Sequence, residues 1–222
     1  MPMNNFLIVG FGSSGTRFLA ETLNRSQYIE VAHEDNPFKR SRDVKQANTW
    51  YERRVDALAR KNLAGYGDVN GFLRYRLREY VPGWRKAIIL RDWRDILKSW
   101  AWHWGRERDG QWETRILAQI ERRQWLRHVE QTVRIFEEDI SAGIQVIDFS
   151  RMTGDVAYLS SLCFDFGAID VQITPDVLAK KVNEKNRGRV EHYEEIPRSV
   201  RQPFDKITAA FNEKYILPYV LQ

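Results

Sequence analysis

The sequence predicts an α/β protein of three layers, with a central parallel sheet of four to five strands and helices on both faces. Three observations support this fold class. Short apolar runs rich in β-branched residues recur along the chain, and segments with helical periodicity lie between them. A glycine-rich stretch directly follows the first run. Apolar runs that alternate with helices are typical of parallel sheets buried on both sides.

The predicted strands are four apolar runs, at residues 5–10, 28–33, 86–91 and 144–149. Between them, a first helix is predicted over 16–24 and a long helix over 114–140, because apolar residues recur there at intervals of three or four. Towards the end of the chain we expect a helix, a basic loop and a final helix over 204–215. In parallel sheets, ligands gather beyond the carboxyl ends of the strands. The loops that follow the predicted strands are therefore the candidate site.

The composition is that of a folded protein with a mixed surface. Of the 222 residues, 43% are hydrophobic, and the 11 Phe, 9 Tyr and 8 Trp exclude a disordered chain. No repeat, low-complexity tract or linker divides the sequence, so we expect a single domain over residues 1–222. The net charge of +5 arises from 35 basic and 30 acidic residues. This balance suits an anionic small ligand and does not predict a nucleic-acid partner.

Cysteine content and hydropathy predict a cytoplasmic location. The single cysteine, Cys163, excludes an internal disulfide and a cysteine-only metal site. It also fits a reducing compartment. No apolar stretch approaches the ~18 residues of a membrane span, and the first residues lack the pattern of a secretory signal. We therefore expect no membrane insertion.

The glycine-rich stretch GFGSSGTRFL, residues 10–19, has three interpretations. Gly10, Gly12 and Gly15 match the dinucleotide fingerprint G-x-G-x-x-G, and Glu30 follows at the distance of a ribose-binding acid. Gly10 and Gly15 also have the spacing of a nucleotide triphosphatase loop, although Thr16 occupies the position of its lysine. In that interpretation Asp148, at the end of a predicted strand, would hold magnesium.

The third interpretation is a site for one compact phosphate group. Backbone N–H groups of the loop, the hydroxyls of Ser13, Ser14 and Thr16, and a helix N-terminus together suit such an anion. Arg17 adds a fork of hydrogen-bond donors.

A second motif, ILRDWRDILKSW at residues 89–100, follows the third predicted strand. Arg91 lies at the carboxyl end of this strand, and a helix that begins near Trp93 carries Ser99. An arginine at a strand end and a serine in the next helix can bind a further anionic group. Two such sites at neighbouring strand ends indicate a nucleotide that is phosphorylated at two separate positions.

These motifs resemble the sulfotransferases that use 3′-phosphoadenosine 5′-phosphosulfate (PAPS), a family with a P-loop NTPase-like fold. GFGSSGTRFL is similar to their 5′-phosphosulfate loop, and LRDWRDILKSW resembles their 3′-phosphate motif. YGDVNGFL, residues 66–73, is similar to the segment before the third strand in bacterial and carbohydrate sulfotransferases. NRGR, residues 186–189, resembles the basic loop that closes over the donor.

The resemblance implies PAPS as donor, 3′,5′-adenosine bisphosphate (PAP) as product, and no metal. It implies one group of residues at the 5′-phosphosulfate: Gly12, Ser13, Ser14, Gly15, Thr16 and Arg17. It implies a second group at the 3′-phosphate, with the last three closing over it: Arg91, Ser99, Arg187, Gly188 and Arg189. The acceptor would be a small molecule or a glycan that offers a hydroxyl or an amine.

The loop AHEDNPF, residues 32–38, supplies the candidate base, because the family often has a catalytic His or Glu in this region. Glu34 is the first candidate and His33 the second, with His103 and Asp68 as further candidates. A base of either type contributes about 10²–10⁴-fold to rate.

Two positions depart from the family pattern. Ser13 stands where the family usually has Lys or Arg, and Trp93 stands where it has Pro. Arg17, Lys39 or Arg40 are candidates for the missing cation at the leaving group. Two alternatives therefore stay open beside a sulfotransferase: a nucleotide kinase-like enzyme, and a sulfotransferase-fold domain that binds a nucleotide without turnover.

Overall fold

The structure is a computed structural model that describes residues 4–35, 37, 43–61, 63–105, 110–179 and 190–220. The predicted donor-closing residues Arg187, Gly188 and Arg189 lie outside the described residues, as do Lys39 and Arg40. The chain groups into two compact units. The first comprises residues 1–90 and 139–182, and the second comprises residues 91–138 and 183–222.

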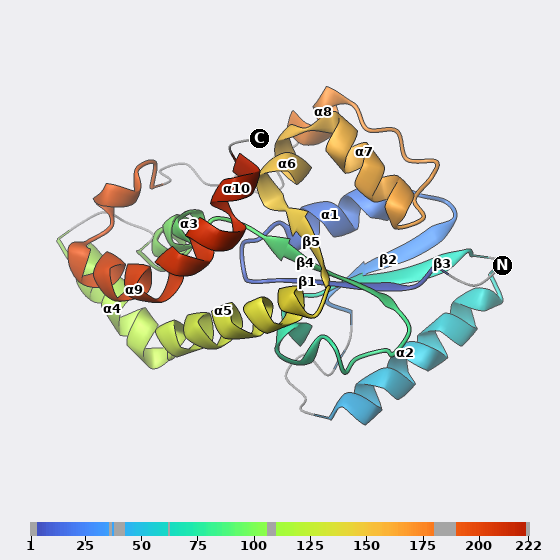
Figure 1. The fold of residues 1–222 in the computed structure, drawn as a ribbon, viewed down its shortest axis with the longest axis horizontal. Coiled ribbons are helices and arrows are strands. Elements are labelled where there is room, and N and C mark those ends of the chain that lie inside the picture. Colours follow the sequence, from blue (N-terminus) through green and yellow to red (C-terminus); the bar gives the residue numbers. More distant parts are fainter. Residues whose placement is uncertain are drawn as a thin grey trace. The chain divides into compact units, whose positions relative to one another are not determined.

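The first unit is built on one parallel sheet of five strands in the order β2-β3-β1-β4-β5 (Figure 1). The strands are β1 (Phe6–Gly10), β2 (Ile29–His33), β3 (Gly65–Val69), β4 (Arg85–Leu90) and β5 (Gln145–Asp148). The predicted α/β class is confirmed, and β1, β2, β4 and β5 correspond to the four predicted strands. β3 is a fifth strand that the apolar runs did not indicate.

Helices cover both faces of this sheet (Figure 1). They are α1 (Thr16–Leu23), α2 (Val44–Ala59), α6 (Phe149–Gly154), α7 (Val156–Asp165) and α8 (Pro175–Ala179), with the short 3-10 helix η1 (Leu73–Arg76) after β3. On one face, Leu19 of α1 and Leu159 of α7 pack in one cluster with Phe6 of β1. On the other face, the ring of Tyr51 of α2 packs against the rings of Tyr66 and Trp84, which also contact each other.

Two glycines explain how β3 fits into the middle of the sheet. A Cβ on Gly67 would lie 2.0 Å from the Phe6 ring, and a Cβ on Gly65 would lie 2.4 Å from the Asn4 carbonyl oxygen. Glycine is therefore required at both positions by close approach of neighbouring atoms. The same glycines lower the strand propensity of the segment.

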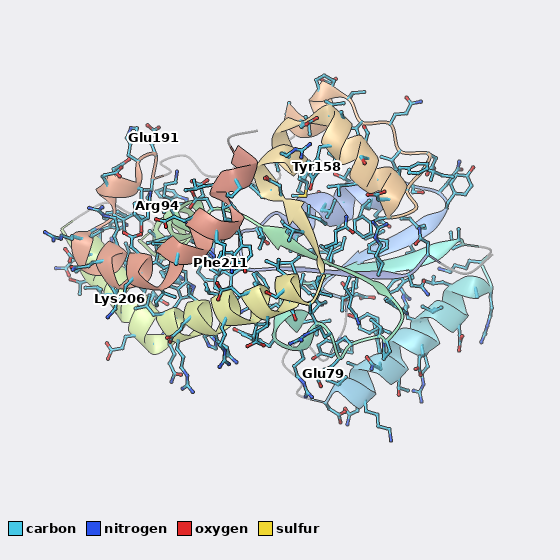
Figure 2. All side chains as sticks on the ribbon, in the orientation of Figure 1. Glu79, Arg94, Tyr158, Glu191, Lys206 and Phe211 are labelled. Carbon is cyan, nitrogen blue, oxygen red and sulfur yellow. The ribbon has the colours of Figure 1, made fainter. Side chains whose placement is uncertain are left out.

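The second unit is helical. Its elements are α3 (Trp93–Gly105), α4 (Trp112–Arg122), most of α5 (Trp125–Ser141), η2 (Tyr193–Glu195), α9 (Arg198–Tyr215) and α10 (Leu217–Val220). Aromatic rings form its core: Trp125 stacks on Phe204 at 5.3 Å between centroids. Along α9, Phe211 is buried whereas Lys206 is exposed, and Figure 2 labels both side chains.

The predicted long helix over 114–140 is wrong in one respect, because the structure divides it into α4 and α5. Gln124, between them, has a left-handed backbone with φ of 49°. The apolar spacing continues across this break, since both helices contribute buried residues, so periodicity alone did not reveal it. Across the described residues, no helix combines the length and apolar character needed to cross a membrane.

Candidate functional site

The glycine loop connects β1 to α1. The backbone N–H of Ser14 donates to the carbonyl oxygen of Phe11 at 3.0 Å, which closes a tight turn. Ser13 and Gly15 both have left-handed backbones, with φ of 69° and 83°. A Cβ on Gly15 would also lie 2.7 Å from the ring of Phe149. Backbone conformation and packing therefore both require glycine at position 15.

The N-terminus of α1 gives the loop a positive electrostatic potential. The first N–H groups of an α-helix have no carbonyl one turn earlier to bind, and the helix dipole adds partial positive charge at this end. In α1, no acidic residue occupies the first turn, and no described side chain caps the helix. The loop therefore has the properties of an anion site.

The polar side chains of the loop point in different directions. Ser14 is buried, its hydroxyl has no hydrogen-bond partner among the described residues, and a Cβ on Gly10 would lie 2.0 Å from it. Arg17 is exposed and pairs with Glu21 of the same helix at 3.2 Å. The hydroxyl oxygen of Thr16 lies 3.2 Å from Nε2 of His33.

The end of β2 brings both candidate bases to the same edge as the glycine loop. His33 is joined to the start of α1 by its contact with Thr16. Glu34 has a left-handed backbone with φ of 57°. A Cβ built on Gly71 would lie 3.3 Å from a carboxylate oxygen of Glu34 and 3.4 Å from the carbonyl oxygen of Gly10. The Glu34 carboxylate thus lies near the start of the loop.

Asp68 supports the turn at Glu34 through a hydrogen bond from the Glu34 backbone N–H. Its carboxylate is fully buried and accepts hydrogen bonds from the Tyr51 hydroxyl at 2.6 Å, the Asn70 side-chain amide at 3.2 Å and the Glu34 backbone N–H at 3.1 Å. Burial raises the pKa of Asp68 to about 6, although these hydrogen bonds act in the opposite direction. The sequence suggested Asp68 as a further candidate base, and in the structure its carboxylate helps to position Glu34.

Arg74 of η1 is a candidate that sequence reasoning missed. Its guanidinium lies 4.8 Å from the centroid of the Phe11 ring in the glycine loop. It donates hydrogen bonds to the carbonyl oxygen of Gly71 and to the Tyr75 hydroxyl. Burial lowers the pKa of Arg74, and the charge of nearby Glu34 opposes this shift. No motif marked this arginine, because only the fold brings η1 to the loop.

The structure weakens both alternative interpretations of the loop. Glu30, the ribose-binding acid of a dinucleotide site, pairs with Arg54 at 2.5 Å and with Lys61 at 3.6 Å. It lies near the start of β2, whereas the loop lies beyond the other end of the sheet. Asp148, the magnesium ligand of a triphosphatase, caps α6 by accepting from the Arg151 backbone N–H at 3.0 Å.

Arg91 directly follows β4, in which Ile89 is the register partner of Gly10. Arg91 is therefore two residues along the chain from Ile89, the residue that pairs with Gly10 at the start of the glycine loop. Ser99 lies within α3, and His103 lies in its last turn.

The start of α3 is fixed by polar contacts inside the helical unit. Asp92 accepts from the Arg94 backbone N–H at 2.7 Å and from the Asn212 amide at 2.9 Å. Trp93 is buried against Phe204 and Phe211. The Trp93 side chain thus fills a volume in this core that a proline could not fill.

No protein-family model matches the sequence, and none of the curated proteins compared with it matches. Among solved structures, the chain is similar to a crystal structure of a sulfotransferase from Alicyclobacillus acidocaldarius. The two share 19% sequence identity over 80% of this chain and 88% of that chain, with a TM-score of 0.49.

Proposed function

We propose that the protein is a PAPS-dependent sulfotransferase of the cytoplasm, which transfers a sulfuryl group to a hydroxyl or an amine of a small-molecule or glycan acceptor. One observation carries this proposal: a glycine loop at a helix N-terminus and two candidate bases, His33 and Glu34, lie at the same end of the sheet. Binding of a nucleotide needs no base of this kind, whereas transfer of a group to a hydroxyl is accelerated by one.

The residues of the loop fit an anionic donor. The loop amides from Gly12 to Arg17 and the hydroxyl of Thr16 would bind the 5′-phosphosulfate. Ser14 would have to rotate away from Gly10 to reach it. The remaining contacts are proposed from the sequence motifs, with the 3′-phosphate bound by Arg91, Ser99, Arg187, Gly188 and Arg189. When bound, PAPS supplies an activated sulfuryl group and a phosphate leaving group.

Glu34 is the proposed general base and His33 the alternative. Glu34 would accept the proton of the acceptor hydroxyl as the acceptor oxygen forms its bond to sulfur. His33, held by Thr16, would orient the donor loop or take the proton instead. Sulfuryl transfer resembles phosphoryl transfer, in which positioning and charge stabilisation dominate. The loop amides and the arginines proposed at the phosphates would supply this stabilisation, so the proposal includes no protein-bound metal.

Ligand-induced thermal stabilisation tests this proposal. The protein is melted alone and with PAP, ADP, ATP plus magnesium, or NAD. A ligand at 100 times its dissociation constant adds ~2.7 kcal/mol to the free energy of unfolding, and we expect this stabilisation from PAP above the other ligands. Preference for ATP plus magnesium would support a kinase, and preference for NAD a dehydrogenase. Binding of PAP without sulfate transfer from PAPS to any of a broad acceptor panel would support the non-catalytic alternative.

A further inference from the structure

We propose that Arg74 neutralises the negative charge that develops on the leaving 5′-phosphate, an inference that rests on the proposed sulfotransferase function. The reaction needs a cation at this point. As the bond between sulfur and the bridging oxygen breaks, its electron pair remains on the phosphate oxygen, and a fixed positive charge nearby stabilises the transition state.

The glycine loop contains a single basic residue, Arg17, and its position does not suit this role. Residues 10–16 include neither lysine nor arginine. Arg17 follows at once, but 67% of its side chain is exposed, and it extends along α1 to pair with Glu21. A guanidinium in this position is screened by solvent, which weakens its effect on the reacting atoms.

Arg74 differs from Arg17 in both burial and orientation. Its guanidinium packs against Phe11, the residue that directly follows β1, and against the ring of Tyr75 at 4.4 Å. Hydrogen bonds to Gly71 and to the Tyr75 hydroxyl fix its direction. Arg74 is partly buried, and a charge that is held in place before the reaction and partly shielded from solvent stabilises developing charge more than a mobile surface charge does.

Protonation of Glu34 during the reaction would change how far the positive charge of Arg74 is balanced by a neighbouring negative charge. The carboxylate of Glu34 lies close to Gly71, whose carbonyl accepts from Arg74, and it acts electrostatically on the guanidinium. When Glu34 takes the acceptor proton, it becomes neutral. The positive charge of Arg74 is then no longer balanced by Glu34, at the stage when negative charge builds on the leaving phosphate.

Three adenosine nucleotides test this role by isothermal titration. AMP carries only the 5′-phosphate, adenosine 3′-phosphate carries only the other group, and PAP carries both. We expect Arg74→Met to weaken binding of AMP and PAP by the same factor, about 10–100-fold for the loss of a charge-assisted contact. Binding of adenosine 3′-phosphate should be unchanged. The matched control is Arg76→Met, because Arg76 lies in the same 3-10 helix but pairs with Glu79.

The outcomes separate the two proposals. If the unmodified protein prefers PAP but Arg74→Met binds AMP as tightly as Arg76→Met does, the role of Arg74 is wrong and the proposed function stands. If the unmodified protein shows no preference for PAP, the proposed function fails, and the role of Arg74 fails with it. Should Arg74→Met fail to fold, Arg74→Gln decides: it keeps a polar side chain but loses the charge, so AMP affinity equal to that of the unmodified protein overturns the proposal.

Discussion

The backbone of Glu34 shows how a single residue can be held in a costly conformation at a functional edge. A left-handed backbone costs a non-glycine residue about 1–2 kcal/mol, and Glu34 adopts it directly after β2. Its backbone N–H is held by the carbonyl oxygen of Val69 and by the carboxylate of Asp68. The position of the candidate base therefore depends on a buried acid that the ligand need not touch.

The titration of Asp68 makes this support pH-dependent, and the hydroxyl of Tyr51 is the group to remove. The folded-state pKa of Asp68, about 6, lies above its ordinary value of 3.8. The stability that Asp68 contributes is therefore present at low pH and is lost as pH rises from about 4 to about 6. Tyr51→Phe removes a donor that favours the ionised form and so raises the folded-state pKa of Asp68 further. The cost of this substitution should therefore grow as pH rises above about 6. We expect about 0.5–1.5 kcal/mol at pH 4.5 and about 1.5–3 kcal/mol at pH 7.5, measured by urea unfolding.

The control for this prediction is the same substitution in an Asp68→Asn background. An amide does not ionise in this range, so the cost of Tyr51→Phe should there be equal at both pH values. A cost in the parent protein that is the same at pH 4.5 and pH 7.5 would show that Asp68 does not change its ionisation over this range.

At this scale the sequence predicts only part of the site. His33 and Glu34 could be found because they follow a recognisable strand, and carboxyl ends of parallel strands collect ligands. Arg74 could not, because three arginines alternate over residues 74–78 and their spacing does not distinguish the one that faces the loop. That choice depends on how η1 turns after β3, which tertiary packing determines.

Among the elements, the connection from β1 to α1 makes the strictest demand on sequence. Gly15 must adopt a left-handed backbone and also leave room for Phe149. Gly83, before β4, has nearly the same φ, 84° against 83° for Gly15, but a Cβ there would meet nothing within 4 Å. A comparison of the same substitution at these two glycines therefore distinguishes the cost of backbone strain, which both share, from the cost of packing, which only Gly15 has.

Alanine at each of these positions should reveal that difference. Gly83→Ala should cost only the backbone strain, about 1–2 kcal/mol. Gly15→Ala should cost about 1–3 kcal/mol more, because the added methyl displaces the ring of Phe149. Urea unfolding measures both, and PAP titration should show lost binding only for Gly15→Ala. Equal costs at the two sites would mean that the ring moves freely, and that packing does not constrain the loop.

Element prediction from the sequence succeeded where apolar residues dominated. β1 is a continuous apolar run, and β2, β4 and β5 each contain at least one buried β-branched residue beside two polar ones, a pattern that still indicates strands of a parallel sheet. β3 contains two glycines and an aspartate in five residues, and this low strand propensity is why the sequence did not indicate a strand here. The close approach of Phe6 and Asn4 explains why the glycines are needed. The division between α4 and α5 was missed for the opposite reason, since apolar spacing continued where the backbone turned.

At the scale of the whole molecule, each phosphate of the proposed donor is assigned to one sequence motif. The 5′-phosphosulfate is assigned to the glycine loop, and the 3′-phosphate to the motif at residues 89–100. The glycine loop belongs to the sheet unit, and Arg91 is the residue at which the chain enters the helical unit. The net charge of +5 favours a doubly phosphorylated nucleotide over a neutral one. The net charge does not show how much each phosphate contributes to binding affinity, so the two contributions must be measured separately.

The ratio of PAP to AMP affinity isolates the contribution of the 3′-phosphate. Arg91→Met should lower PAP affinity by about 10–100-fold, the loss of one charge-assisted contact, and should leave AMP affinity unchanged. Ser99→Ala should lower the same ratio by less, because a neutral hydroxyl donates a weaker hydrogen bond to an anion than a guanidinium does. Arg94→Met is the matched control, since Arg94 packs on Tyr193 instead of following β4. If Arg91→Met weakened AMP and PAP alike, Arg91 would act on the 5′-phosphate or on folding, and the assignment of the second motif to the 3′-phosphate would be wrong.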